Sequence, residues 1–352
     1  MRVYKQQNVL NAARERVAWI FQTYPRVVVS ISSGKDSTVL AYLCSEEAQR
    51  QGREVEFFFL DQEAEYAATV DQVRLMMAWP NVKPLWYQVP IRMTNATSYE
   101  EDFLFAWGPG LHWMREKEPG AIRKEPRAPD RFYPFFRWME EQLGENAVSL
   151  IGLRSEESLN RYRAVTRHPG REGINWSSKG KGTTKFYPLY DWTFEDVWTY
   201  LYCYHVPYNK IYDWLYIKGE HIPGFRVSNL IHEKAFKCLA LLQEFEPDTY
   251  NRLIARIGGI TVAARYAKEA SVFRARTLPK TYKTWKSFRD FLLETIPTDT
   301  AQLFRERFEA HLVSESVYRQ QARQLLLNDW ENNVPVVQQE DTDPLEKWRA
   351  IL

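Results

Sequence analysis

The sequence predicts an α/β fold, in which helices cover a parallel β-sheet and a helical C-terminal domain follows. Strand-like and helix-like segments alternate through the first half of the chain, which is typical of a parallel sheet. The apolar runs Val27–Ile31 and Val55–Leu60 have the composition of strands buried on both faces. After Pro207 the apolar residues are spaced as in helices, so we place a change of architecture near residues 206–228.

Each element of the first half is predicted from its own pattern of apolar residues. Residues 1–25 are expected to contain an amphipathic helix, because apolar side chains recur there at helical spacing. The strand that begins at Val27 leads through a glycine turn into a helix that starts at Ser37. The further expected elements are strands at 55–60, 85–89 and 147–151, and helices at 64–79, 132–143 and 193–205, the last with Thr193 as N-cap and Asp196 as capping-box acid.

Two segments interrupt this order within the expected α/β domain, residues 1–215. Residues 92–131 contain glycines, prolines and aromatic residues without a regular period, so we interpret them as an inserted lid or binding loop. Residues 161–185 carry seven basic side chains against the single acid Glu172. We expect an aperiodic loop there, which either is solvated or grips a polyanion.

The second half is expected to be a helical domain at residues 216–331. Apolar residues at helical spacing predict helices at 230–245, 247–257, 287–293 and 300–327. Residues 332–352 are rich in acids and glutamine, and we expect a weakly ordered tail.

Composition and charge describe an ordinary globular protein. The net charge of +2 and the isoelectric point near 8.2 provide no general field for coating nucleic acid. No apolar run approaches membrane-spanning length and residues 1–25 do not resemble a secretory signal, so we expect a cytoplasmic protein with no membrane partner. Cys44, Cys203 and Cys238 are widely separated, which argues against zinc and against an iron–sulfur cluster held by this chain alone. We expect each cysteine to be buried among apolar side chains.

The turn between the first strand and its helix has the chemistry of a phosphate-binding site. It consists of Ser32, Ser33, Gly34, Lys35, Asp36 and Ser37. Free backbone N–H groups of the first helical turn and the helix dipole attract an anion, while Lys35 adds a positive charge and the serines add hydroxyls. The spacing is not that of the common P-loop, because Val29 and Asp36 stand where that motif needs a glycine and a hydroxyl. A capped helix without any ligand is the simpler alternative.

Carboxylates near this turn suggest a magnesium ion. Asp36 would repel a phosphate unless a divalent cation lay between them. Asp61 ends the second strand, and ligands of open parallel sheets bind outside the carboxyl ends of adjacent strands. Asp36 and Asp61 together would suit Mg²⁺, which also keeps water and phosphate oxygens as ligands. Asp61 could equally be a cap for the next helix.

A second glycine follows the fourth expected strand. From Gly152 to Arg161 the chain reads GLRSEESLNR, and Arg154 and Arg161 can each bind phosphate oxygens through a bidentate guanidinium group. Glu156 or Glu157 could hold one guanidinium in place. A solvated loop is the alternative interpretation.

Three blocks of the sequence resemble the phosphoadenosine phosphosulfate (PAPS) reductase family, which belongs to the PP-loop ATP pyrophosphatases. They are SSGKDS at 32–37, GLRSEESLNR at 152–161 and YPLYDWTFEDVWTYLYCYHVPYNKIYD at 187–213. The resemblance covers residues 25–215 and implies an adenine nucleotide alpha-hydrolase-like fold, a doubly wound parallel sheet of five strands. The region from about Val227 resembles the C-terminal extension of a subgroup that includes the immunoglobulin-binding regulator A-type proteins, which are associated with a ParB-like partner.

The resemblance also implies roles for individual residues. The 32–37 turn would hold the terminal phosphates of ATP with Asp36 near the metal, and Arg154 and Arg161 would grip the anionic end of the nucleotide. Gly152 would belong to the same site. Reductases of this family attack sulfate with a cysteine in a Glu-Cys-Gly-x-His motif, which this sequence lacks. Without an activated thiolate, the reductive step has no nucleophile.

We therefore expect an enzyme that binds Mg-ATP and cleaves it between the α and β phosphates, giving an adenylyl group to an acceptor and releasing pyrophosphate. Catalysis would be electrostatic, through Lys35, Asp36 and Arg154. Two alternatives stay open. One is a binder of PAPS or a related nucleotide without reductase activity. The other is a regulatory protein whose nucleotide orders the C-terminal helices for a ParB-like partner.

Overall fold

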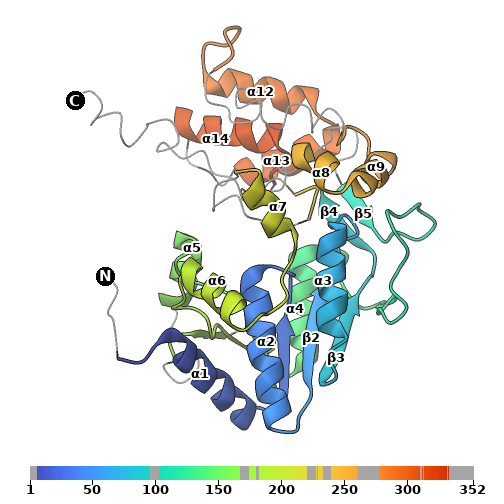
Figure 1. Cartoon of the computed structure of the whole chain (residues 1–352). Helices are drawn as coiled ribbons and strands as arrows, with labels where there is room; N and C mark the ends of the chain where they lie inside the picture. The colour runs from blue at the N-terminus through green and yellow to red at the C-terminus, as the bar shows by residue number, and fades with distance from the viewer. Residues whose placement is uncertain are drawn as a thin grey trace. The chain divides into compact units, whose positions relative to one another are not determined.

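The chain divides into two compact units (Figure 1). The computed structural model describes residues 6–95, 103–166, 174–179, 182–219, 227, 229–232, 239–260, 278–309, 311, 313–330 and 332 of the 352 residues. Unit 1 comprises Met1–Ile91 and Ala106–Ser228, and unit 2 comprises Arg92–Phe105 and Asn229–Leu352. The segment interpreted as one insertion, 92–131, is therefore shared between the two units.

A six-stranded sheet forms the centre of unit 1. Its strand order is β3-β2-β1-β6-β8-β7. The strands are β1 (Arg26–Ser30), β2 (Val55–Leu60), β3 (Val82–Tyr87), β6 (Ala147–Ile151), β7 (Ser177–Lys179) and β8 (Thr184–Phe186). Five of them are parallel, which confirms the predicted α/β fold, and the short edge strand β7 adds a sixth that is antiparallel.

Helices cover both faces of this sheet. The described helices of unit 1 are α1 (Val9–Thr23), α2 (Lys35–Arg50), α3 (Ala67–Met77), α4 (Phe132–Leu143), α5 (Leu159–Thr166), α6 (Phe194–Cys203) and α7 (Ile211–Ile217). α2 and α3 lead from β1 to β2 and β3, and α4 returns the chain to β6 on the other side of β1. Because such crossovers are right-handed, α2 and α3 lie on one face and α4 on the other (Figure 1).

Aromatic side chains of β2 pack on both faces, which explains why this strand is apolar throughout. Phe57 packs against Trp79, which follows the C-cap of α3, with ring centroids 5.8 Å apart. Phe58 points to the opposite face and packs against Phe135 and Phe136 of α4. The strand is buried along its whole length, as a central parallel strand must be.

The direction of the strand order reverses between β1 and β6. β1 is followed in the chain by β2 on one side, whereas β6 is followed by β8 on the other. In open α/β sheets a crevice forms at such a switch point, outside the carboxyl ends of the strands, and ligands bind there. The 32–37 turn follows β1 and Gly152 follows β6, so both segments flank the switch point.

The basic segment 161–185 is not an aperiodic loop, and that prediction is wrong. It contains most of α5, the whole of β7 and the first two residues of β8. The two strands have three residues each, so they are too short for an alternating pattern to be visible in the sequence. Residues 167–173 and 180–181 lie outside the described residues.

The described part of unit 2 consists mainly of helices. They are α8 (Leu239–Phe245), α9 (Pro247–Arg256), α12 (Trp285–Thr295), α13 (Thr298–Phe308) and α14 (Glu315–Leu326), and β4 (Ile91–Thr94) pairs with β5 (Phe103–Ala106). The single helix expected at 300–327 is two helices, because Ser314 caps a new one by accepting the Val317 backbone N–H (3.3 Å). The expected tail, 332–352, lies outside the described residues except for Asn332.

No helix in the described ranges combines the length and the apolar character needed to cross a membrane.

The predicted capping box of α6 is present and can be tested. Thr193 Oγ1 accepts the Asp196 backbone N–H (3.0 Å), and Asp196 Oδ2 accepts the Thr193 backbone N–H (2.8 Å). Thr193→Ala is expected to lower the free energy of unfolding, measured by urea denaturation, by about 1 kcal/mol. Thr23→Ala is the control, because that hydroxyl is exposed at the end of α1 and its removal should change stability by less than about 0.5 kcal/mol. Equal losses in the two variants would contradict the assigned cap.

Candidate functional site

Serine side chains shape the turn between β1 and α2. Ser37 Oγ donates to the Gly34 carbonyl oxygen (2.9 Å) and accepts the Ser32 backbone N–H (3.2 Å). Ser32 Oγ lies 3.1 Å from Ser37 Oγ. Ser37 is buried and Ser32 is exposed. The Ser37 hydroxyl is therefore used within the turn, and Ser32 is the accessible serine of this pair.

The first turn of α2 leaves backbone N–H groups for a ligand. Gly34 is the N-cap and provides no side-chain acceptor. Among the described contacts, the N–H groups of Asp36 and Ser37 have no protein acceptor, whereas that of Thr38 donates to the Gly34 carbonyl (2.9 Å). Unpaired N–H groups at the positive end of a helix attract an anion.

Three charged side chains meet beside these N–H groups. Lys35 Nζ lies 2.9 Å from Asp36 Oδ2, and Arg154 Nε contacts Asp36 Oδ1. The side chains of Lys35, Asp36 and Arg154 are 9%, 14% and 4% exposed. Two buried cations thus surround one buried anion, which leaves a net positive charge among the buried side chains that suits an anionic ligand. A second carboxylate, Glu156, is 41% exposed, with Oε2 3.9 Å from Arg154 Nη1. Because Asp36 is already neutralised, its carboxylate alone does not require a divalent cation.

Gly152 lets the loop after β6 touch the first turn of α2. A Cβ atom at this position would lie 2.9 Å from the backbone C and O atoms of Asp36 and from the backbone N of Ser37. Neighbouring backbone cannot yield as a flexible side chain would, so the close approach depends on glycine. The contact brings Gly152 and Arg154 to the 32–37 turn.

Two residues of the 207–213 segment also contact the turn, and sequence reasoning missed them. Asn209 Nδ2 donates to Ser33 Oγ (2.8 Å), and the Lys35 backbone N–H donates to Tyr212 Oη (3.0 Å). Burial raises the pKa of the Tyr212 phenol well above its ordinary value, so the hydroxyl stays protonated at neutral pH. The available signal was that both polar side chains lie in 187–213, the third block that resembles the PAPS reductase family.

Arg161 has different surroundings from Arg154. Its guanidinium contacts Glu157, one turn earlier on the chain, and its side chain is 40% exposed. Its described contacts do not include the 32–37 turn. Lys185 Nζ lies 2.6 Å from Glu140 Oε1, so two of the basic side chains in the 161–185 segment are paired within the protein.

Asp61 is fully buried, and protein donors occupy its carboxylate. Trp86 Nε1 and Gln88 Nε2 each donate to Oδ2 (2.9 Å), and the Glu63 backbone N–H donates to Oδ1 (3.0 Å). Arg115 Nη2 lies 2.6 Å from both carboxylate oxygens. These donors take the lone pairs that a metal ion would need. The contacts of Asp61 therefore favour a structural role over metal binding.

Glu63 anchors the same loop as Asp61. Its carboxylate accepts the backbone N–H groups of Trp107 (2.7 Å) and Met114 (3.1 Å). Trp107 Nε1 in turn donates to the Asp61 carbonyl oxygen (2.8 Å). The two acids that follow β2 thus hold the 107–115 loop against the carboxyl edge of the sheet.

A cluster of metal-ligating side chains or an exposed cysteine thiol would each indicate a particular chemistry. Within the part of the chain that the structure describes, no three His, Cys, Asp or Glu side chains are grouped so as to hold a metal ion. The prediction that each cysteine is buried holds for Cys44 and is wrong for Cys203, which lies exposed in the last turn of α6. Cys238 lies outside the described residues.

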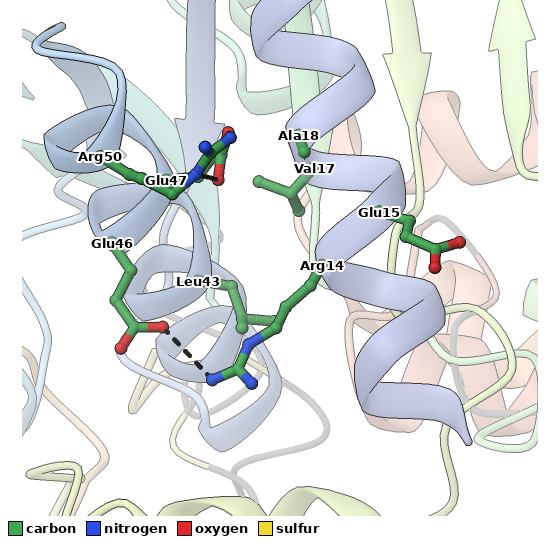
Figure 2. Close-up of a pocket in the computed structure, with 8 residues that line it drawn as sticks. All are labelled: Arg14, Glu15, Val17, Ala18, Leu43, Glu46, Glu47 and Arg50. Carbon is green, nitrogen blue, oxygen red and sulfur yellow. Dashed lines mark hydrogen bonds and ion pairs between the residues drawn. The ribbon is translucent and has the colours of Figure 1, made fainter. Parts of the chain in front are cut away.

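A pocket between α1 and α2 is separate from the turn (Figure 2). It has a volume of about 460 Å³ and is lined by Arg14, Glu15, Val17, Ala18, Leu43, Glu46, Glu47 and Arg50. The α2 residues that line it belong to the C-terminal half of the helix, whereas the anion-binding turn lies at its N-terminus. Figure 2 shows Arg14 reaching across to Glu46, with Nη2 and Oε2 3.9 Å apart.

Comparison with known families identifies the domain that carries this site. The phosphoadenosine phosphosulfate reductase domain matches residues 26–260, more than half of the chain. This chain belongs to the PAPS reductase domain family. The match confirms the predicted family and spans the sheet of unit 1, the 32–37 turn and Arg154, so the turn is part of a PAPS reductase-like nucleotide-binding domain. A domain of unknown function, DUF3440, matches residues 219–336.

The relatives of this PAPS reductase-like chain match different shares of its length. Uncharacterized protein YbdN of Escherichia coli is 28% identical over 326 residues, which cover 87% of this chain and 79% of that protein. Adenosine 5'-phosphosulfate reductase of Staphylococcus saprophyticus is 24% identical over 204 residues, 57% of this chain and 72% of the reductase. A crystal structure of PAPS reductase from Candida auris in a phosphate complex aligns with a TM-score of 0.32 and 16% identity, covering 60% of this chain and 93% of that one.

The close packing at Gly152 yields a stability prediction. Gly152→Ala is expected to lower the free energy of unfolding by about 1–3 kcal/mol, because the added methyl group meets backbone atoms of Asp36 and Ser37. Gly120→Ala is the matched control, since a Cβ atom there meets nothing within 4 Å. Urea denaturation of both variants measures the difference, and a Gly152→Ala protein as stable as the control would show that the contact is not tight.

The cysteines are expected to differ in reactivity. Burial raises the pKa of the Cys44 thiol far above neutrality, so this residue should not react with a thiol reagent such as DTNB in the folded protein. Exposed Cys203 should react under the same conditions. Peptide mass spectrometry after labelling, with Cys203→Ser as the control, locates the label. Labelling of Cys44 as fast as Cys203 without denaturant would contradict its burial.

Proposed function

We propose that this protein binds Mg-ATP at the 32–37 turn and cleaves it between the α and β phosphates. One observation carries the proposal: free N–H groups of α2 and the buried cations Lys35 and Arg154 converge at the switch point of a PAPS reductase-like domain. A polyphosphate is the anion whose charge and size suit this combination of N–H groups, ammonium and guanidinium.

In the proposed reaction, a nucleophilic oxygen of the acceptor forms a bond to the α-phosphorus. The α–β anhydride bond breaks, and pyrophosphate leaves with the electron pair of that bond. Lys35 and the N–H groups of Asp36 and Ser37 would stabilise the negative charge that moves onto the pyrophosphate. Arg154 would exchange its contact with Asp36 for a phosphate oxygen, because a guanidinium binds either anion in the same bidentate way.

Magnesium fits this proposal through Asp36 rather than Asp61. Mg²⁺ in nucleotide sites takes one or two carboxylates and completes its shell with phosphate oxygens and water. Asp36 adjoins the free N–H groups and would become available when Arg154 turns to the phosphates. The metal would neutralise phosphate charge. The prediction that Asp61 is a second ligand has weaker support, because its carboxylate already accepts from four protein residues.

PAPS or a related nucleotide is the second candidate ligand, because the family match names PAPS and several relatives are named after adenosine 5'-phosphosulfate. Arg161, on α5, is the further cation that would meet an additional phosphate, and its side chain is partly exposed. Reductive cleavage is not part of this proposal, because the sequence has no Glu-Cys-Gly-x-His motif.

The remaining expectations from the sequence stay predictions. They are the acceptor of the adenylyl group, the ParB-like partner, the polyanion at residues 161–185, the cytoplasmic location and the likeness of the C-terminal region to the immunoglobulin-binding regulator A-type proteins.

Calorimetry and a pyrophosphate assay test the proposed function. The protein is expected to bind Mg-ATP more tightly than PAPS and to release pyrophosphate when its acceptor is present. Lys35→Ala should weaken ATP binding by about tenfold or more, because one buried cation of the site is lost while Asp36 keeps Arg154 as its partner.

Lys83→Ala is the matched control for this variant. Lys83 also pairs with a carboxylate, with Nζ 3.2 Å from Glu56 Oε1, but it is 58% exposed and lies on β3. The Lys83→Ala variant should bind ATP with the affinity of the native protein. Tighter binding of PAPS than of ATP would favour the second candidate, and ATP binding that never yields pyrophosphate, alone or with partner proteins, would refute the cleavage.

A further inference from the structure

Ser33 has a backbone conformation that a non-glycine residue adopts only when other contacts impose it. Its φ angle is +58°, in the left-handed region, which costs free energy for any residue with a Cβ atom. Ser33 is fully buried at the centre of the turn, directly before the N-cap Gly34. The direction of every later N–H group in the turn depends on this angle. Some contact must therefore hold it.

Asn209 makes the contact that can hold Ser33. Its Nδ2 donates to Ser33 Oγ (2.8 Å) and to Thr69 Oγ1 (2.9 Å), and its Oδ1 accepts the Ile211 backbone N–H (3.0 Å). Ile211 donates, so Oδ1 must face it and the NH₂ group must face the two hydroxyls. Asn209 is 1% exposed, and both its donors and its acceptor are used. A buried amide whose donors and acceptor are all used has one orientation, so its hydrogen bond fixes the position of the Ser33 hydroxyl.

Tyr212 supports the same turn one residue further on. The Lys35 backbone N–H donates to Tyr212 Oη (3.0 Å), and Tyr212 Oη would lie 3.6 Å from a Cβ atom at Gly34. Asn209 and Tyr212 thus contact the residues before and after Gly34, Ser33 and Lys35. The free N–H groups of Asp36 and Ser37 begin after this second contact.

We propose that Asn209 is a positioning residue of the nucleotide site, which keeps Ser33 left-handed and so fixes the 32–37 turn in its anion-binding shape. It does this without touching the ligand, because its polar atoms are committed to Ser33, Thr69 and Ile211. The Ser33 hydroxyl, which the sequence places among the phosphate ligands, is the acceptor of this positioning contact. Only the affinity test below rests on the proposed nucleotide binding.

Hydrogen exchange of the nucleotide-free protein tests the geometry by itself. The backbone N–H groups of Ser32 and Lys35 are hydrogen-bonded in the turn, so they should exchange slowly. Asn209→Ala should speed exchange in a peptide covering residues 31–38 by about tenfold, because release of Ser33 lets the turn open. Ser33→Ala should have the same effect and leaves the contacts of Asn209 with Thr69 and Ile211 in place, which keeps the test valid if Asn209→Ala folds poorly.

Asn81→Ala is the matched control. Like Asn209, Asn81 is an asparagine whose side chain both donates and accepts hydrogen bonds, but its partner is a residue of α2 away from the turn: its Nδ2 donates to the Ser45 carbonyl (2.8 Å) and its Oδ1 accepts from Ser45 Oγ (2.9 Å). Ser45 lies in the C-terminal half of the helix. Exchange in residues 31–38 should therefore be unchanged in this variant. Equal loosening by Asn81→Ala would mean that α2 responds to any lost hydrogen bond, and it would overturn the proposal.

A double-mutant cycle with Ser33→Gly separates positioning from general stability. Glycine adopts a φ angle of +58° without the strain that serine has, so the turn should keep its shape without Asn209. Calorimetry should show Mg-ATP binding weakened about tenfold by Asn209→Ala in the native background and by less than about twofold in the Ser33→Gly background. Equal losses in both backgrounds, or unchanged exchange in Asn209→Ala and Ser33→Ala, would overturn the assignment.

Discussion

The contact between Gly152 and the first turn of α2 is the constraint on which the candidate site depends. A parallel sheet places the loops after β1 and β6 next to each other, but it does not determine how closely they approach. Here the approach is limited only by backbone atoms, since a Cβ atom at Gly152 would come within 2.9 Å of Asp36 and Ser37. This packing brings Arg154 to Asp36 and turns two separate loops into one site.

The buried ion group explains how a carboxylate can stand inside an anion-binding turn. An isolated Asp36 would oppose the helix dipole's attraction for phosphate, and burying it without a partner would be costly. Lys35 and Arg154 remove that cost, and they also leave one positive charge in excess among the buried side chains, since Glu156, the other carboxylate beside Arg154, is 41% exposed. In the proposed reaction, the group would rearrange around a polyphosphate by exchanging partners, without bringing a new unpaired charge into the protein interior.

Much of the architecture could be predicted because its signals are local. β2, α4 and β6 have the bounds that their apolar patterns indicated, and Thr193 caps α6 with the expected acid. The basic segment was misread, because β7 and β8 are too short to show a period and are defined by pairing with each other and with β6. The candidate site likewise has a part with a local signal and a part set by long-range contacts. The turn itself was visible in the sequence, whereas the contacts of Ser33, Asp61 and Tyr212 depend on partners far along the chain, which no local pattern reports.

The distance along the chain between the turn and its supports has a consequence for synthesis. Ser33 and Asn209 are 176 residues apart, and Lys35 and Tyr212 are 177 apart. The turn leaves the ribosome early, while the residues that complete its hydrogen bonds emerge only near the end of unit 1. Contacts of such high sequence separation form late, because a long loop must close before they stabilise anything. A nascent chain would thus carry the entire SSGKDS sequence for most of its synthesis without a finished anion site, so nucleotide could bind and stabilise the domain only after its last strand and helices had formed.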